Sequence, residues 1–205
     1  AIKYHLADGA GGLAQMRANI DAWWPHIERG AIEAIVINAS GCGAMVKDYG
    51  HLLRHEPPYA ERAARVSAMA HDVSELLPDL VAALRGRGRP PAEVLAWHAP
   101  CTLQHGQQLR GGVEQHLGAL GFRLRPAAQE AHLCCGSAGT YSVLQPELSL
   151  RLRERKLGQL LDEGAADQPA AILSANIGCI THLQAGTEVP VRHWIELLDQ
   201  ALHAT

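Results

Sequence analysis

The chain has 205 residues, of which 47% are hydrophobic, and a formal net charge of −3. This length allows one large domain or two small ones with a substantial core, while the charge balance, without a basic stripe, argues against a nucleic-acid partner. No apolar run approaches the roughly 18–20 residues that a membrane-spanning helix needs, and AIKYHLADGAGG at the start lacks a signal-peptide core. Because the chain begins without Met, we expect it to be a fragment or a processed chain.

Apolar spacing in the first part of the chain predicts helices around one buried strand. Residues 13–27 have helical spacing. The stretch AIEAIVINASGC, 31–42, predicts a buried strand that runs to its final cysteine. Residues 66–84 again have helical spacing, and Pro78 within them predicts a kink or two consecutive helices. The stretch RGRGRPPA, 85–92, has no apolar period and predicts a linker.

Strands and helices alternate after this linker. Short apolar runs predict strands at 93–101, 122–127, 170–179 and 189–193. Helical spacing predicts helices at 113–120, 148–161 and 194–202. This alternation is typical of βαβ units, so we expect an α/β fold with a mainly parallel sheet.

The two halves of the chain contain similar segments. AIVINASGC at 34–42 and AILSANIGC at 171–179 both predict a buried strand followed by Gly-Cys, and they lie 137 residues apart. The same offset aligns Tyr141 with Tyr4, and in each copy the tyrosine precedes a helix that leads into the Gly-Cys strand. We therefore expect the start of the chain to correspond to the second half of a module that is complete in residues 93–203.

The five cysteines indicate thiol or metal chemistry, because an odd number without a secretion signal argues against a disulfide framework. Cys134 and Cys135 are adjacent in HLCCGSAGTYS, and adjacent side chains on a strand point to opposite faces. Gly136 and Gly139 would let the backbone turn so that both thiols meet one centre. A single tetrahedral metal rarely accepts adjacent ligands, whereas a multinuclear cluster tolerates them because each thiolate can bind a different metal atom.

Two further cysteines, Cys101 and Cys179, end predicted buried strands. Ligands of parallel α/β sheets collect beyond the carboxyl ends of strands, so we expect all four thiols at one sheet edge. Four thiolates suit an iron–sulfur cluster and a structural zinc ion equally well. Three other interpretations stay open: cysteines that are merely buried, a vicinal disulfide, and a redox enzyme with a low-pKa thiol. Nearby histidines would ligate or hydrogen-bond a sulfur, or be ordinary core or surface residues: His98, His105, His132 and His182.

Several segments give the chain a family resemblance. HAPCTLQH (98–105), HLCCGSAGTYS (132–142) and SANIGC (174–179) resemble the cysteine-rich CCG domain, which usually occurs twice in proteins related to the cysteine-rich subunit of heterodisulfide reductase. Together with NIDAWWP, ASGCGAMVKDYG and VRHWIELLDQAL, they are most similar to the iron–sulfur subunits of bacterial glycolate oxidases (glycolate dehydrogenases). The resemblance spans essentially the whole chain.

The resemblance implies two related CCG modules, each a small, mainly parallel sheet flanked by helices. On this basis residues 1–86 are a partial first module that is truncated at its N-terminus, residues 87–92 are a linker, and residues 93–205 are a complete second module. The missing CCG segment of the first module would precede Ala1. The role of Cys42 is therefore left open.

The resemblance also implies electron transfer. Cys101, Cys134, Cys135 and Cys179 would bind a metal centre, an iron–sulfur cluster of the [4Fe–4S] type, which receives electrons from a flavin subunit during the oxidation of glycolate to glyoxylate. The family pattern often ends in C-x-x-C, but here it reads Cys179-Ile-Thr-His182, so a fifth thiol is missing. The alternative is a structural zinc site in a docking scaffold that has no direct redox role.

The expected partners are the flavin-containing subunits of the glycolate-oxidising complex. The chain has no flavin-binding fingerprint and no recognisable general base, so we expect catalysis to belong to the assembled complex rather than to this chain alone. The resemblance implies a cytoplasmic location, with peripheral association at the inner face of the cell membrane through the complex as an open alternative.

Overall fold

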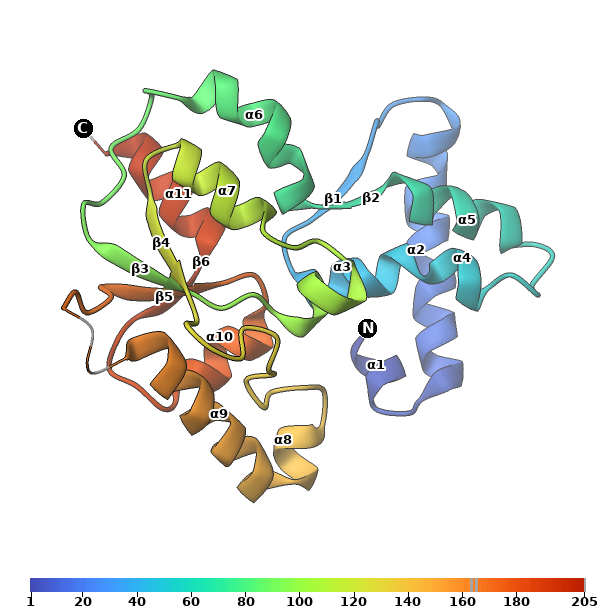
Figure 1. Cartoon of the computed structure of the whole chain (residues 1–205). Coiled ribbons are helices and arrows are strands. Elements are labelled where there is room, and N and C mark those ends of the chain that lie inside the picture. Colours follow the sequence, from blue (N-terminus) through green and yellow to red (C-terminus); the bar gives the residue numbers. More distant parts are fainter. Residues whose placement is uncertain (163, 165, 205) are drawn as a thin grey trace. The chain divides into compact units, whose positions relative to one another are not determined.

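The computed structural model describes residues 1–162, 164 and 166–204, and the chain divides into two compact units (Figure 1). The first unit comprises Ala1–Val73 and the second Ser74–Thr205. The stretch predicted as a linker lies within the second unit, where it leads from a helix into a strand. Its backbone is held there, since Arg89 N donates a hydrogen bond to Ala201 O at 2.9 Å.

The first unit consists of helices around a pair of parallel strands. Its elements are α1 (Ile2–His5), α2 (Gly9–Glu28), β1 (Ile35–Ile37), α3 (Ser40–Lys47), α4 (Tyr49–Leu52), α5 (Ala60–Met69) and β2 (Ala70–Asp72). The predicted helix at 13–27 is confirmed within α2, which begins earlier because Asp8 caps it by accepting a hydrogen bond from Gly11 N at 2.8 Å. Side chains from four helices form the core: Met16, Ile20, Val46, Leu53 and Val66.

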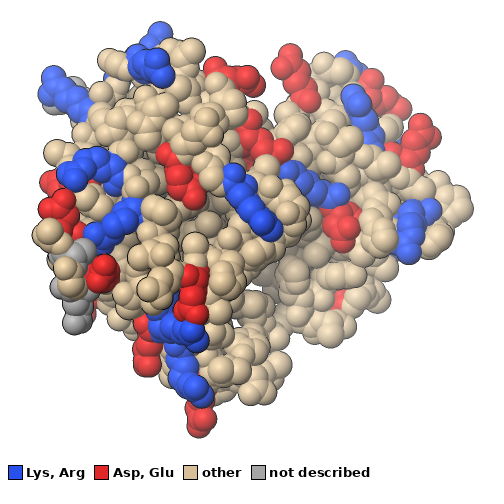
Figure 2. Space-filling model, in the orientation of Figure 1, with Lys and Arg blue, Asp and Glu red and all other residues tan. Residues whose placement is uncertain are grey.

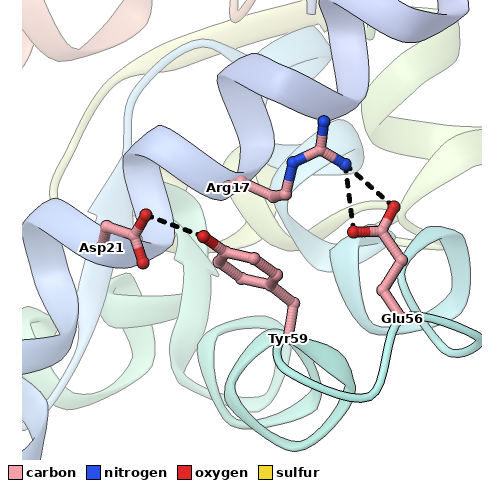
Figure 3. Close-up of polar contacts among 4 residues, drawn as sticks. All are labelled: Arg17, Asp21, Glu56 and Tyr59. Atoms are coloured by element: carbon pink, nitrogen blue, oxygen red, sulfur yellow. Dashed lines mark hydrogen bonds and ion pairs between the residues drawn. The ribbon is translucent and has the colours of Figure 1, made fainter.

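Two polar contacts join α2 to the segment that leads into α5 (Figure 3). Arg17 Nη1 donates to both carboxylate oxygens of Glu56, at 2.9 and 3.0 Å. The Tyr59 hydroxyl donates to Asp21 Oδ2 at 2.9 Å. Both contacts bridge more than 35 residues of sequence, so they fix the connection between α4 and α5 against α2.

The second unit is a parallel sheet with helices on both faces. Its elements are the 3₁₀ turn η1 (Val73–Leu76), α6 (Leu77–Leu84), β3 (Val94–Trp97), the π-helical turn η2 (Thr102–Gly106), α7 (Gly112–Ala119), β4 (Arg123–Pro126), α8 (Tyr141–Leu144), α9 (Pro146–Leu161), β5 (Ala171–Ser174), α10 (Ile177–Gln184), β6 (Val191–His193) and α11 (Trp194–His203). Helices α6, α7 and α11 lie on one side of the sheet and α9 and α10 on the other (Figure 1).

The strand order of this sheet is β4-β3-β5-β6, with every pair parallel. The chain leaves β3 toward β4 on one side and returns to β5 on the other side of β3. The central strands are covered on both faces, and accordingly all four residues of β5 are buried. The predicted α/β class with a mainly parallel sheet is confirmed.

Four predicted boundaries are wrong. The strand predicted at 93–101 ends at Trp97. The strand predicted at 170–179 ends at Ser174, and that predicted at 31–42 ends at Ile37; in both cases a helix follows within a few residues. Periodicity cannot separate a buried strand from the buried first turn of the next helix. The helical pattern at 66–84 belongs to two helices, α5 and α6, as one of the two predicted alternatives has it, but β2 and η1 separate them. Pro78 lies in the first turn of α6, where its missing N–H costs no hydrogen bond.

The order of elements in the two units is compatible with the predicted repeat. The first unit runs α1, α2, β1 and α3, and the second contains α8, α9, β5 and α10 in the same order. The next strand, β6, follows α10 directly, whereas α4 and α5 precede β2 in the first unit. Tyr4 lies in α1 and Tyr141 begins α8. Cys42 and Cys179 are each the third residue of the helix that follows the buried strand. The equivalence of the two units stays a prediction.

Two surface properties bear on the classes of partner. Among the helices of the described residues, none combines the length and apolar character that a membrane crossing requires. On the face drawn in Figure 2, basic and acidic side chains are interspersed. This mixture agrees with the small net charge of the chain.

Candidate metal centre

Three segments of the second unit meet beyond the carboxyl ends of β3 and β5. The first directly follows β3 and carries His98 and Cys101, the second is the CCG loop between β4 and α8, and the third is the start of α10. From β3 the chain first adds β4 on one side and then β5 on the other side, so the order of strands reverses between β3 and β5. Such a switch point leaves a crevice between two diverging loops, where α/β sheets bind their ligands.

Cys101 lies at the start of the π-helical turn that follows β3, and its side chain is half-buried. Leu103 N and Gln104 N both donate to Pro100 O at 3.0 Å. The Gln104 side chain also donates to Ala99 O at 2.9 Å and to Ala131 O at 3.3 Å. These contacts connect the Cys101 turn to the loop that carries the two adjacent cysteines.

Gly136 makes the turn that lets both adjacent cysteines face one centre. Its φ is +96°, and a Cβ there would collide with the backbone oxygen of Ser149. Gly136 N donates to Cys134 Sγ at 3.2 Å, and Gly136 O accepts from Ser149 Oγ at 2.7 Å. Cys134 is half-buried and Cys135 is fully buried. The turn packs so closely against α9 that residue 136 must be glycine, as the sequence predicts.

Cys179 lies in the first turn of α10 and is buried. Its sulfur accepts hydrogen bonds from Asn176 Nδ2 at 3.7 Å and from Ser137 Oγ at 3.8 Å. Ser137 Oγ also lies 3.3 Å from Cys135 Sγ. Ser137 thus links the CCG loop to α10 and places the sulfurs of Cys135 and Cys179 next to each other.

Hydrogen bonds connect the four cysteine sulfurs in a series, from Cys101 to Cys134, then to Cys135 and to Cys179. The bond between Cys101 and Cys134 raises the pKa of Cys101 and lowers the pKa of Cys134 to about 2. The bonds of Cys135 to Cys134 and then to Cys179 raise the pKa of Cys135. The bond from Cys135 holds the pKa of Cys179 well below its usual value, and His98 lowers it further. The protonation of the four thiols is therefore coupled, and metal binding must release the protons that they hold.

Lys156 of α9 places a positive charge beside these sulfurs. The side chain is fully buried, and Nζ donates to Glu130 O at 2.7 Å. Burial lowers the pKa of Lys156, while the charges of Cys101 and Cys135 oppose this shift. Sequence reasoning missed this residue. The available signal was its position in the apolar stripe of α9, four residues from both Leu152 and Leu160.

The histidines near the cysteines have different surroundings. An imidazole nitrogen of His98 lies within 4.8 Å of the sulfurs of Cys135 and Cys179, and all three residues are buried. His182 Nε2 instead contacts Ser149 Oγ at 3.2 Å. His105 is exposed, and its Nε2 lies 3.2 Å from the backbone oxygen of His132, which is also exposed.

Cys42 is exposed and lies in α3 of the first unit. The four cysteines of the second unit come from three loops that follow different strands. Thiolates are soft ligands that suit iron–sulfur clusters and zinc, and four of them complete the protein ligand set of either. The donor set thus fits the metal centre that the sequence predicts.

Residues 95–184 match the family described as the cysteine-rich domain, CCG. This segment is a CCG domain. It contains all four clustered cysteines together with His98 and Lys156. The resemblance recognised in the sequence is thereby confirmed, and the CCG domain occupies the greater part of the second unit.

The alignments with relatives extend beyond the CCG domain and cover most of the chain. The glycolate oxidase iron-sulfur subunit of Escherichia coli K12 is 49% identical over 98% of this chain and 48% of its own length. A probable glycolate oxidase iron-sulfur subunit of Bacillus subtilis is 27% identical over 92% of this chain and 40% of its own length. Lactate utilization protein A of Exiguobacterium sp. is 29% identical over 85% of this chain and 71% of its own length. The chain therefore spans about half, or less, of the first two relatives.

Proposed function

We propose that the CCG domain binds an iron–sulfur cluster of the [4Fe–4S] type and serves as an electron-transfer site. The protein ligands would be Cys101, Cys134, Cys135 and Cys179. The observation that carries this proposal is the contact among four cysteine sulfurs from three loops at the switch point of the sheet. When bound, the cluster supplies one-electron redox chemistry.

The protein contributes the surroundings of the cluster. Ser137 and Asn176 donate hydrogen bonds to the sulfur of Cys179, and Gly136 N donates to that of Cys134. Such bonds orient the ligands and stabilise their charged form. The buried ammonium group of Lys156 offsets part of the negative charge that four thiolates would bring into the unit.

The substrate proposal rests on the relatives named above. A chain similar to the iron-sulfur subunit of a glycolate oxidase would work in a complex that oxidises glycolate to glyoxylate. A flavin-containing subunit of that complex would take up the two electrons and pass them to the cluster one at a time. We place this work in the cytoplasm, with any contact to the inner face of the membrane made through the complex.

The domain proposal extends the same resemblance to the first half of the chain. Residues 1–86 would form a partial CCG module, 87–92 the linker, and residues 93–205 the complete module. The matching order of elements around Cys42 and Cys179 supports it. In this arrangement only the second module holds a full cysteine set within this chain.

Metal analysis of the full chain, purified without oxygen, tests the proposal. Several irons per chain with matching acid-labile sulfide are expected. Replacing any of the four clustered cysteines with alanine should remove most of the iron, whereas Cys42→Ala should leave it unchanged, because Cys42 is exposed in the first unit. Zinc near one per chain without sulfide would contradict the proposal and make the domain a structural scaffold. Equal iron loss in Cys42→Ala would contradict the ligand assignment.

A further inference from the structure

We infer that His98 is a fifth protein ligand of the proposed metal centre, which makes the ligand set a mixture of thiolate and imidazole. This inference rests on the proposed function, because it concerns a ligand of the same centre. It assigns a role to a buried histidine that the cysteine pattern alone does not include.

The backbone of His98 is fixed at the switch point. His98 directly follows β3, and its N–H donates to Leu173 O of β5 at 2.9 Å. Its carbonyl oxygen accepts from the buried Ser174 hydroxyl at 3.0 Å. Both bonds cross from β3 to β5, so the imidazole projects from a rigid point between the loops that carry the cysteines. A ligand on such an element keeps its position before the metal binds.

The imidazole lies within reach of the sulfurs. One of its ring nitrogens is within 4.8 Å of both Cys135 Sγ and Cys179 Sγ, and the side chain is only 2% exposed. A metal atom that binds these sulfurs would occupy the space between the three groups. Imidazole nitrogen is a common ligand of iron and zinc. In iron–sulfur proteins it can replace thiolate on one iron.

His98 Nε2 is buried, and within the described part of the chain it has no hydrogen-bond partner. Buried polar atoms are almost always hydrogen-bonded, so an exception calls for an unseen partner. A metal at the centre would supply one. The hydrogen bonds of His98 to β5 involve only its backbone, whereas its ring interacts with the Cys179 side chain and therefore lies beside the sulfurs.

His182 is the histidine that its position in the sequence would favour, because it stands where the family often has a second cysteine. Its Nε2 atom, however, is engaged by Ser149, whose hydroxyl lies 3.2 Å and whose backbone oxygen lies 3.4 Å away. His182 therefore supports the Gly136 turn rather than facing the sulfurs. The structure instead places the imidazole of His98 next to the sulfurs of Cys135 and Cys179.

Pulsed electron paramagnetic resonance of the reduced, cluster-loaded full chain tests the inference. Protein labelled only in histidine with ¹⁵N should show the strong hyperfine coupling of a directly bound nitrogen, shifted from its ¹⁴N value. His98→Cys should keep the cluster, since a thiolate replaces the imidazole, but lose this coupling. The matched control is the triple variant H105Q/H132Q/H203Q, which should retain the coupling because all three side chains are exposed.

The outcomes separate this inference from the proposed function. Wild-type protein without iron and sulfide would overturn both. A loaded cluster whose spectrum is insensitive to histidine labelling, or shows only the weak coupling of a hydrogen-bonded ring, would overturn the His98 assignment alone. Strong coupling that survives in His98→Cys, or vanishes in the triple variant, would overturn it as well. If His98→Cys fails to hold a cluster, labelled and cluster-loaded His182→Gln decides the question, because loss of the coupling there would overturn the assignment and its retention would support His98.

Discussion

Cys134 and Cys101 are equally accessible thiols whose protonation differs. Both are half-buried, so exposure does not favour either one. The hydrogen bond from Cys101 and that from Cys135 lower the pKa of Cys134 to about 2, whereas the bond to Cys134 raises the pKa of Cys101. Between pH 5 and 8, Cys134 is therefore the thiolate of this pair and Cys101 the thiol. Only the thiolate is a strong nucleophile.

We predict that iodoacetamide modifies Cys134 before Cys101 in the reduced, metal-free chain at pH 6. Because pH 5 to 8 lies entirely above the pKa of Cys134, its rate should stay nearly constant over this window, while Cys101 should react only as the pH rises further. Peptide mass spectrometry after a single brief exposure measures both rates. Loading the metal should protect both residues. A rate at Cys134 that rises tenfold per pH unit, as for an ordinary thiol, would contradict the assignment.

At the scale of elements, α2 and the connection between α4 and α5 offer a contact whose contribution can be measured. The Arg17 and Glu56 side chains are 32% and 31% exposed, so their ion pair is neither fully solvated nor buried. An exposed pair contributes about 0.2–1 kcal/mol to the free energy of unfolding, and two-oxygen geometry favours the upper end. The pair joins segments 39 residues apart, so its loss should loosen the connection as well as α2.

We predict that Arg17→Met lowers the free energy of unfolding of the first unit by about 1 kcal/mol. Hydrogen exchange of the α2 and α5 amides under native conditions gives this quantity for the first unit. A double-mutant cycle with Glu56→Gln should show that most of this loss is the interaction energy between the two side chains. Arg65→Met is the control, because Arg65 is exposed on α5. Equal effects of the two arginine variants would mean that the ion pair contributes nothing specific.

The elements show which features the sequence could predict. Long periodic segments such as α2 and α9 follow from apolar spacing because one face of each is buried. The central strands β3 and β5 follow from continuous apolar runs because both of their faces are covered. The boundaries near Cys179 and Cys42 do not follow, because a buried strand and a buried helix turn have the same apolar composition. β2 was missed because its residues continue the helical pattern of α5, and its strand state comes from pairing with β1, a contact distant in sequence.

The residues of the candidate site also differ in how far the sequence alone identifies them. The four cysteines and Gly136 can be identified from their local pattern, because an adjacent pair with glycine is rare and has few structural uses. Lys156 cannot, and His98 is only one of four candidate histidines that the sequence does not rank, since a single lysine or histidine gains its meaning from burial and from neighbours on other elements. Their environment depends on how β3, β5 and α9 pack together, which spacing along one element does not contain.

At the scale of the whole molecule, all proposed metal ligands lie in one of the two units. A ligand that binds only the folded state stabilises it by RT ln(1 + [L]/Kd), about 2.7 kcal/mol at a hundredfold excess over Kd. The ligands directly follow β3, lie in the CCG loop between β4 and α8, and lie in α10, while β5 pairs with β3 and leads to α10. Opening of these segments would release the metal. Stabilisation should therefore appear in the second unit, while the first unit has no ligand through which to gain it.

We predict that metal loading of the full chain slows amide hydrogen exchange in β3, β5 and α10 by about a hundredfold, and leaves α2 and β1 unchanged. Removing the metal with a chelator should reverse the protection. Cys179→Ala, which removes one ligand, should weaken it in all three elements together, because they share the centre. Cys42→Ala is the control and should behave as the unaltered chain. Protection that extends to α2 would contradict the assignment of the ligands to the second unit alone, and would identify the first unit as part of the metal-binding structure.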